Sequence, residues 1–159
     1  MMLTFVQVHR GYGNVHLYGS AIIDRAVNFM ISYDVTGNPD VMWQEIAQQM
    51  IIDQPTMLVL AVLDDDEQVV GHLIAEMQNH HGILVIMVTQ AELDPNDSLQ
   101  KGMMMKRAWS FVTEWATKLG AKKIMCWALD ESRAAIFEKL GLEMTDKVIM
   151  EMPVLPGGE

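Results

Sequence analysis

The chain has 159 residues, of which half are apolar and a fifth are charged. This composition is typical of a folded domain and excludes a disordered chain. No apolar run reaches the roughly 18 residues that a membrane-spanning helix needs, so we expect no membrane partner. The first residues lack a basic start followed by an apolar stretch, and Cys126 is the single cysteine. We therefore expect a cytoplasmic protein without a secretion signal or an internal disulfide.

The negative charge is concentrated in one part of the chain. Residues 1–100 hold two basic and thirteen acidic side chains, whereas residues 101–159 hold nine basic and eight acidic ones. Nucleic-acid binding requires clustered Lys and Arg, so we expect no nucleic-acid partner. The acidic part is compatible with a cationic substrate such as an amine, and solubility alone explains the same charge.

A strand and two helices are expected at the start of the chain. The alternating residues 3–8 predict the strand. Residues 20–33 carry apolar side chains at helical spacing, with Ser20 as the N-cap. Asn38 caps a second helix, which has a proline in its first turn and is expected to end near Asp53.

Three long apolar segments follow, and we expect them to form an antiparallel meander. The first is apolar at nearly every position, which is typical of a central strand that is buried on both faces. Polar turns join it to the second segment and the second to the third. These strands are expected at residues 56–63, 68–78 and 83–93.

A long amphipathic helix is expected after the turn at residues 94–98, and Gly120 ends it. Its expected apolar face comprises Met104, Ala108, Phe111, Val112, Trp115 and Leu119. A strand, a short helix and a last strand are then expected at residues 123–129, 131–140 and 147–152.

This order of elements predicts one domain over residues 1–152 and a flexible tail at residues 153–159. A meander followed by crossovers predicts an α/β (α+β) fold, with a mixed, mostly antiparallel central sheet and helices on both faces.

The predicted order is similar to that of the GNAT N-acyltransferase family. Three stretches carry the resemblance, and they are VVGHLIAEM (69–77), SFVTEWATKLGAKKIMCWAL (110–129) and SRAAIFEKLGLEM (132–144). The resemblance implies a GNAT-like acyltransferase domain with acetyl-CoA as its co-substrate. It also implies an amine, in a small molecule or a protein, as the acceptor of the acetyl group. A homodimer is expected by analogy only.

The family binds the CoA pyrophosphate at the start of the long helix, on backbone N–H groups flanked by small residues. The matching positions here are Gln100, Lys101, Gly102, Met103, Met104 and Met105. Gln100 fits the pattern, whereas Met103 and Met105 occupy the two small-residue positions. Lys101, Lys106 and Arg107 are placed to pair with phosphates, or they only solvate the helix start. The phosphate loop is therefore degenerate.

The resemblance implies direct attack of the amine on the thioester. Backbone between Ala91 and Leu93 matches the part of the family that holds the thioester oxygen and the pantetheine arm. Glu92 and Glu76 are the candidate general bases, and solvated strand carboxylates are the alternative reading of both. The family commonly places a tyrosine where Phe137 stands, so the hydroxyl that would protonate the leaving thiolate is missing.

No other group of residues predicts chemistry. Cys126 lies in an apolar run without an adjacent histidine, so we expect it in the core. His72, His80 and His81 lack the spacing of metal ligands, so no metal is expected. Three hypotheses stay open: an N-acetyltransferase, a non-catalytic GNAT-fold binding or structural protein, and a regulatory domain that binds acyl-CoA without turnover.

Overall fold

The computed structural model describes residues 3–33, 37–93, 98–128, 131–145 and 152. Five strands form one sheet in the order β1-β2-β3-β4-β5. Neighbouring strands from β1 to β4 run antiparallel to one another, and β5 runs parallel to β4. Their bounds are β1 Thr4–Gln7, β2 Met57–Leu63, β3 Val69–His80, β4 Ile83–Leu93 and β5 Lys123–Cys126. The predicted mixed, mostly antiparallel sheet is confirmed.

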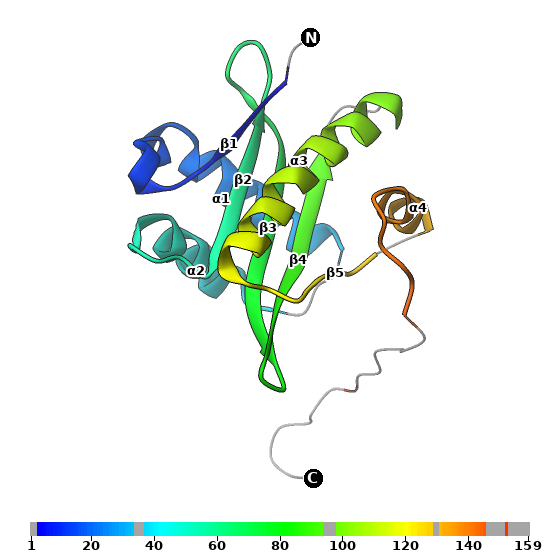
Figure 1. The fold of residues 1–159 in the computed structure, drawn as a ribbon. Coiled ribbons are helices and arrows are strands. Elements are labelled where there is room, and N and C mark those ends of the chain that lie inside the picture. Colours follow the sequence, from blue (N-terminus) through cyan, green and yellow to red (C-terminus); the bar gives the residue numbers. More distant parts are fainter. Residues whose placement is uncertain (1–2, 34–36, 94–97, 129–130, 146–151, 153–159) are drawn as a thin grey trace.

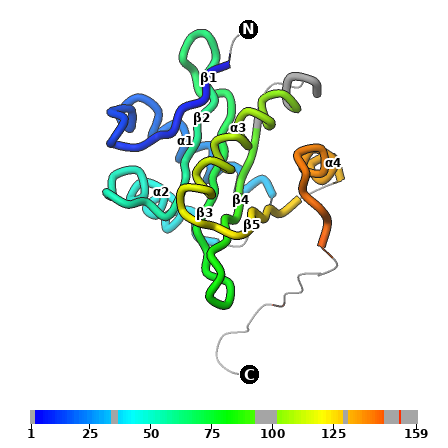
Figure 2. Tube along the Cα trace, in the orientation of Figure 1, coloured from blue at the N-terminus to red at the C-terminus, as the bar shows by residue number. Residues whose placement is uncertain are grey.

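Helices cover both faces of the sheet, as predicted (Figure 1). Two helices, α1 and α2, pack on one face, α3 crosses the other, and α4 lies beside the edge formed by β5 (Figure 2). The bounds are α1 Val15–Ser32, α2 Pro39–Ile51, α3 Ser98–Leu119 and α4 Glu131–Lys139, with a short 3₁₀ turn, η1, at Arg10–Tyr12. No helix in the described ranges is long and apolar enough to cross a membrane. The strand predicted at 147–152 lies outside these ranges except for Met152, and the predicted tail lies wholly outside them.

Strand β2 divides the core into two layers. Its six residues from Leu58 to Leu63 are all buried, because successive side chains point to opposite faces and helices cover both. Leu58 and Leu60 pack in the layer under α3, whereas Val59 and Ala61 pack in the layer under α1 and α2. The run is apolar at nearly every position because its side chains enter two separate hydrophobic layers, one on each face of the sheet.

The first helix begins earlier than predicted. It starts at Val15, so Ser20 lies inside α1 and the prediction of Ser20 as its N-cap is wrong. Asn14 stands at the N-cap, where its side chain accepts from the His9 N–H and donates to the Gln7 carbonyl. Val15 and Tyr18 pack against the core of this layer, and this tertiary contact extends the helix past Gly19. In α2 the predicted cap is confirmed, since Asn38 accepts from the N–H of Asp40.

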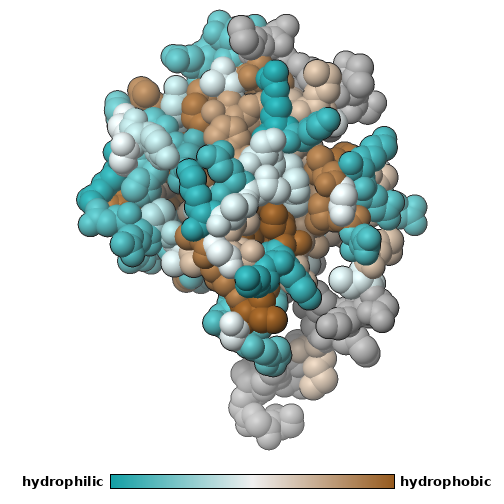
Figure 3. All heavy atoms as spheres, in the orientation of Figure 1, coloured by the Kyte–Doolittle hydropathy of each residue, from teal (hydrophilic) through white to brown (hydrophobic). Residues whose placement is uncertain are grey.

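The buried face of α3 differs in part from the predicted one. Met104, Ala108 and Val112 are buried as predicted. Phe111 is 37% exposed, although its ring stacks on Phe5. Met105, Trp109 and Ala116 are buried instead, at the i, i+4 and i+11 positions of one helical stripe. Figure 3 shows hydrophilic and weakly polar atoms over α3, with apolar surface on both sides of it.

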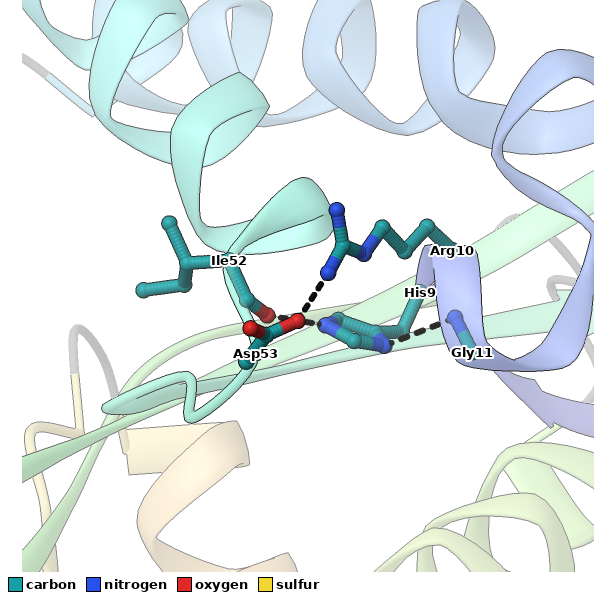
Figure 4. Close-up of polar contacts among 5 residues, drawn as sticks. All are labelled: His9, Arg10, Gly11, Ile52 and Asp53. Carbon is teal, nitrogen blue, oxygen red and sulfur yellow. Dashed lines mark hydrogen bonds and ion pairs between the residues drawn. The ribbon is translucent and has the colours of Figure 1, made fainter.

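A polar clamp joins the turn after β1 to the end of α2 (Figure 4). His9 Nδ1 accepts from the Gly11 N–H, so Nε2 carries the proton and donates to the Ile52 carbonyl over 2.6 Å. Arg10 forms an ion pair with Asp53, and both side chains are largely exposed. The histidine therefore supplies a hydrogen-bond partner to one backbone group at η1 and to another at the end of α2. The exposed Arg10–Asp53 ion pair adds little to stability.

We expect His9→Ala to lower the free energy of unfolding by about 1–2 kcal/mol, because it removes a hydrogen bond to the half-buried Ile52 carbonyl and a second one to the exposed Gly11 N–H. The matched variant Arg10→Ala should change it by less than about 0.5 kcal/mol, because the exposed pair is screened by water. Urea denaturation followed by circular dichroism measures both values. Equal losses in the two variants would contradict the assigned role of His9.

Candidate active site

Strand β4 changes its partners midway along its length. It pairs with β3 from end to end, but with β5 only from Val85 to Val88. Directly after Val88 the register against β3 shifts, and Thr89 is the extra residue of a β-bulge. No residue that the structure describes pairs with β4 on the β5 side beyond Val88. The two parallel strands therefore separate at the bulge, and this leaves backbone polar groups of β4 facing the gap.

A cleft occupies the place where β4 and β5 separate. It encloses only about 10 Å³, room for about one water molecule, and the wider gap of about 250 Å³ includes open solvent. Its lining combines apolar or aromatic residues with three polar ones, and nearly half of the exposed lining is polar. The lining residues are Phe29 from α1, Val88, Thr89, Gln90 and Ala91 from β4, Trp127 just after β5, and Arg133 and Phe137 from α4.

Buried polar side chains hold β4 just beyond the bulge. His72 on β3 is 1% exposed, and Gln90 is 6% exposed. Arg25 Nε donates to His72 Nδ1 over 3.3 Å, so His72 is the neutral tautomer whose Nε2–H donates to Gln90 Oε1 over 2.8 Å. The Gln90 amide nitrogen then donates to the Ala26 carbonyl of α1. The chain of hydrogen bonds fixes Gln90, whose neighbours line the cleft.

Aromatic rings and one guanidinium form the wall of the cleft between α1 and α4. Phe29 packs on Tyr33, the residue that ends α1, with their ring centroids 4.7 Å apart. The Arg133 guanidinium carbon lies 4.5 Å from the centre of the Tyr33 ring, and this side chain donates to the Tyr33 hydroxyl. The contact spans one hundred residues of sequence, and it orients the arginine within the cleft wall.

The two predicted bases lie on the same face of the sheet but in different places. Glu92 stands directly opposite His72, on the face covered by α1 and two residues past Gln90. Glu76 lies four residues along β3 from His72, about 13 Å at the usual rise of a strand, toward the far end of the sheet. Burial raises the pKa of Glu76, and the nearby Glu45 carboxylate adds to the rise. Neither carboxylate lines the cleft, and Glu92 is much the nearer.

The predicted phosphate loop is only partly described. Gln100 and Lys101 belong to the first turns of α3, and their side chains lie outside the described residues. Gly102 has open space around it, so no close contact requires a glycine there. The described side chains of this segment point in different directions: Met103 and Lys106 are exposed, whereas Met104 and Met105 are buried in the core. Arg107 donates to the Leu3 carbonyl, so it also anchors the start of β1.

Two predicted positions reach the cleft, and one of them lacks its expected chemistry. Ala91 lines the cleft, whereas Leu93 ends β4 opposite Gly71, with its side chain outside the described residues. Phe137 also lines the cleft, and its ring packs on Trp109 at a centroid distance of 5.8 Å. The aromatic packing of this position is therefore present without a hydroxyl.

Cys126 is not an activated nucleophile. It ends β5 and packs against the core, and burial raises the pKa of its thiol to about 11. A thiol with such a pKa stays protonated at neutral pH and reacts slowly. Within the described residues, no group of three or more His, Cys, Asp or Glu side chains could hold a metal ion.

Comparison with known proteins places the fold. No model of a known protein family matches the chain. A search of curated protein sequences finds no match either. Among solved structures, the chain is similar to an aminoglycoside acetyltransferase from an uncultured soil metagenomic sample, with a TM-score of 0.69, 13% identity and 96% of each chain covered. A second similar structure is an aminoglycoside antibiotic 6′-N-acetyltransferase from Acinetobacter baumannii, with a TM-score of 0.65, 17% identity and coverage of 97% of this chain and 99% of that one.

The chain has the fold of the GNAT acetyltransferases. A further aminoglycoside acetyltransferase from a soil metagenomic sample has a TM-score of 0.63 and 18% identity, and the match covers 98% of this chain and all of that one. The expected GNAT fold is thus confirmed over nearly the whole chain. Six cleft residues escaped the sequence-based prediction of the GNAT site, because the bulge that gathers them leaves no mark in the residue pattern: Phe29, Val88, Thr89, Gln90, Trp127 and Arg133.

The raised pKa of Glu76 predicts a pH dependence of stability. Because the unfolded chain releases this proton first, ionisation destabilises the folded state as the pH rises above about 4.5. We expect Glu76→Gln, which cannot ionise, to gain stability relative to the parent chain between pH 4 and pH 7. Urea unfolding at both values measures the gain. Glu138→Gln removes an exposed carboxyl as the control, and an equal gain there would show that net charge, rather than burial, causes the effect.

Proposed function

We propose that this chain is an acetyl-CoA-dependent N-acetyltransferase that acts on an amine. The observation that carries the proposal is the cleft at the point where β4 bulges and separates from β5. Three solved structures that share the fold over nearly their whole length are named as aminoglycoside acetyltransferases, which supports the same reaction class. Their names give aminoglycosides as acceptors, and that identity is not carried over to this chain.

The edge of β4 on the β5 side is the proposed site of an extended acyl-thioester. The edge of β4 beyond Val88 offers backbone groups to the amides of a pantetheine arm, in the way that a strand edge binds an extended peptide. The N–H groups between Thr89 and Leu93, Ala91 among them, are the proposed donors to the thioester oxygen as negative charge develops there. The apolar lining from Val88 and Phe137 excludes water from the thioester.

Glu92 is the proposed general base. It lies on the face covered by α1, beside His72 and past the bulge. We propose that a water molecule relays the proton from the amine to this carboxylate. The amine nitrogen loses its proton to this relay and bonds to the thioester carbon. The carbon–sulfur bond then breaks, and the thiolate leaves to take a proton from water, since Phe137 has none to give. Glu76 is the second candidate, and its distance from the cleft makes it the weaker one.

The first turns of α3 are the proposed pyrophosphate site. Their backbone N–H groups belong to Gln100, Lys101, Gly102, Met103, Met104 and Met105, and the start of a helix favours bound anions. Among the side chains of this segment that the structure describes, the exposed Met103 and Lys106 are placed to meet the phosphates, whereas Met104 and Met105 are buried in the core.

One observation favours the non-catalytic alternative. Phe137 fills the place of a proton donor with an apolar ring. A GNAT-fold protein that binds a partner or an acyl-CoA without turnover would need no donor there.

Isothermal titration with acetyl-CoA tests the proposal. We expect a Kd between about 1 µM and 1 mM, the range of ordinary substrate constants. Ala91→Phe should weaken binding at least about tenfold, because its ring fills the cleft. Ala135→Phe, on the exposed side of α4, is the matched control and should bind as the parent chain does. If the parent chain binds no acetyl-CoA, the proposed activity is wrong.

Phe137→Tyr should raise the rate of acetyl transfer and leave the affinity for acetyl-CoA nearly unchanged. The new hydroxyl lies in the cleft wall, where it can protonate the leaving thiolate, an effect worth about 10- to 100-fold when proton transfer limits the rate. Steady-state assay of free thiol measures the change over a panel of amines. An unchanged rate would mean that water already supplies this proton.

A further inference from the structure

The bulge at Thr89 exchanges the faces of β4. Val88, just before the bulge, packs in the layer under α3. Gln90, two positions later, stands opposite Ile74, whose side chain packs in the layer under α1 and α2. In a regular strand, residues two positions apart share one face, so Val88 and Gln90 would lie together. The extra residue therefore turns Gln90 to the α1 face and gives the α3 face to Ala91.

The α1 face supplies partners for both ends of the Gln90 amide. The amide nitrogen donates to the Ala26 carbonyl over 3.2 Å and lies 3.7 Å from the Met42 sulfur. A carbonyl only accepts, so the contact with Ala26 fixes which end of the amide is nitrogen. The amide oxygen at the other end accepts from His72 Nε2 over 2.8 Å. Because Gln90 is 6% exposed, these protein groups replace the hydrogen bonds that water would make.

The layer under α3 is an apolar environment. The structure describes two buried polar or charged side chains, His72 and Gln90, and both lie on the α1 face. In a β4 strand without the bulge, Gln90 would stand opposite Leu73, and its amide would enter the apolar layer under α3. A buried amide that lacks hydrogen bonds loses the free energy of its hydration without compensation. The side chain of Gln90 therefore favours the bulged register.

A second contact holds the bulged residue itself. Thr89 Oγ1 donates to the Ile74 carbonyl over 3.3 Å. The register between β3 and β4 shifts directly after Ile74. Consecutive side chains thus anchor the bulge, Thr89 to β3 and Gln90 to α1.

The register decides which groups of β4 face the proposed reaction. Glu92, the proposed general base, stands opposite His72 on the α1 face, whereas without the bulge it would stand opposite Gly71 on the α3 face. Neighbouring residues of a strand point their N–H groups in opposite directions. The same shift of one residue therefore exchanges the N–H groups that bond to β3 with those that turn toward β5. Both the base and the proposed donors to the thioester oxygen depend on the bulge.

We propose that Gln90 is a positioning residue for acetyl transfer. Its amide holds β4 in the bulged register, which turns Glu92 to the α1 face and directs N–H groups beyond Val88 into the gap beside β5. Gln90 acts through the backbone of β4 and needs no contact with either substrate. The proposal rests on the acetyltransferase function proposed above.

Gln90→Met tests the proposal, because it keeps the length of the side chain and removes the amide. The register is measured by nuclear Overhauser contacts between β3 and β4, which place His72 opposite Glu92 in the bulged strand and opposite Ala91 in a regular one. We expect the parent chain to show the bulged register and the variant to show both. Gln78→Met removes an amide of β3 that also accepts from a histidine, and this matched control should keep the contacts of the parent chain.

The same variant should lose turnover more than affinity. Gln90→Met should lower kcat about 10- to 100-fold, because donors to the thioester oxygen act mainly on the charge of the transition state. The Kd for acetyl-CoA, measured by isothermal titration, should rise by a smaller factor. A single bulged register in Gln90→Met would overturn the proposal, and so would an unchanged kcat in a variant whose registers are mixed.

A double variant separates positioning from stability. Gln90→Met removes the group that accepts from His72 Nε2, so it costs stability. His72→Leu combined with Gln90→Met replaces the pair by apolar side chains, which pack without hydrogen bonds. We expect the double variant to resist urea better than Gln90→Met and to keep the low kcat. Recovery of kcat together with stability would show that Gln90 only stabilises the fold.

The register and the rate also separate this inference from the function on which it rests. If the parent chain transfers no acetyl group but Gln90→Met mixes the registers, the acetyltransferase function fails, while control of the bulge by Gln90 is supported. If the parent chain transfers acetyl groups and Gln90→Met keeps both the bulge and the parent rate, the function stands and the inference is wrong.

Discussion

The candidate site depends on the double pairing of β4. This strand pairs with β3 along its whole length but with β5 over four residues only, and the pairing with β5 ends at the bulge at Thr89. A bulge adds one residue and bends the strand that carries it. The bend opens a gap between β4 and the end of the edge strand β5, and residues of α1 and α4 line this gap.

The buried hydrogen bonds of His72 and Gln90 belong to the same constraint. A polar side chain in the core costs free energy unless all its donors and acceptors are hydrogen-bonded. A pair of apolar side chains would pack there without needing hydrogen bonds. Here Arg25, His72, Gln90 and the Ala26 carbonyl connect α1, β3 and β4 in one series. Because Gln90 directly follows the bulged residue, the series holds β4 on its new course after the bulge.

The sequence predicted the regular elements well where a local signal existed. The three meander strands followed from apolar runs, and the end of α3 followed from Gly120, whose φ of +74° suits glycine. Asn38 correctly marked the start of α2, where its side chain supplies the missing acceptor. The start of α1 was mistaken because contacts with the other elements, rather than a capping residue, extend that helix.

The site was predicted less completely, for physical reasons. Ala91, Glu92 and Phe137 were found through a resemblance, and Ala91 and Phe137 do line the cleft. The wall made by Tyr33 and Arg133 joins residues one hundred positions apart, so no periodicity connects them. The bulge at Thr89 depends on which strands lie on each side of β4, and this is known only once the sheet is assembled.

The hydrogen bond from His9 to the Ile52 carbonyl joins residues 43 positions apart, and it is one of several contacts that close long loops of the chain. The meander β2-β3-β4 pairs neighbours in sequence, whereas β1 reaches β2 across two helices and β5 reaches β4 across α3. Contacts that close long loops carry the larger entropic cost and form late in folding. Phe29 and Arg133 both line the cleft, and they come from these distant parts of the chain. The central hairpins can thus assemble first. The cleft is completed only when the first and last parts of the fold have packed around them.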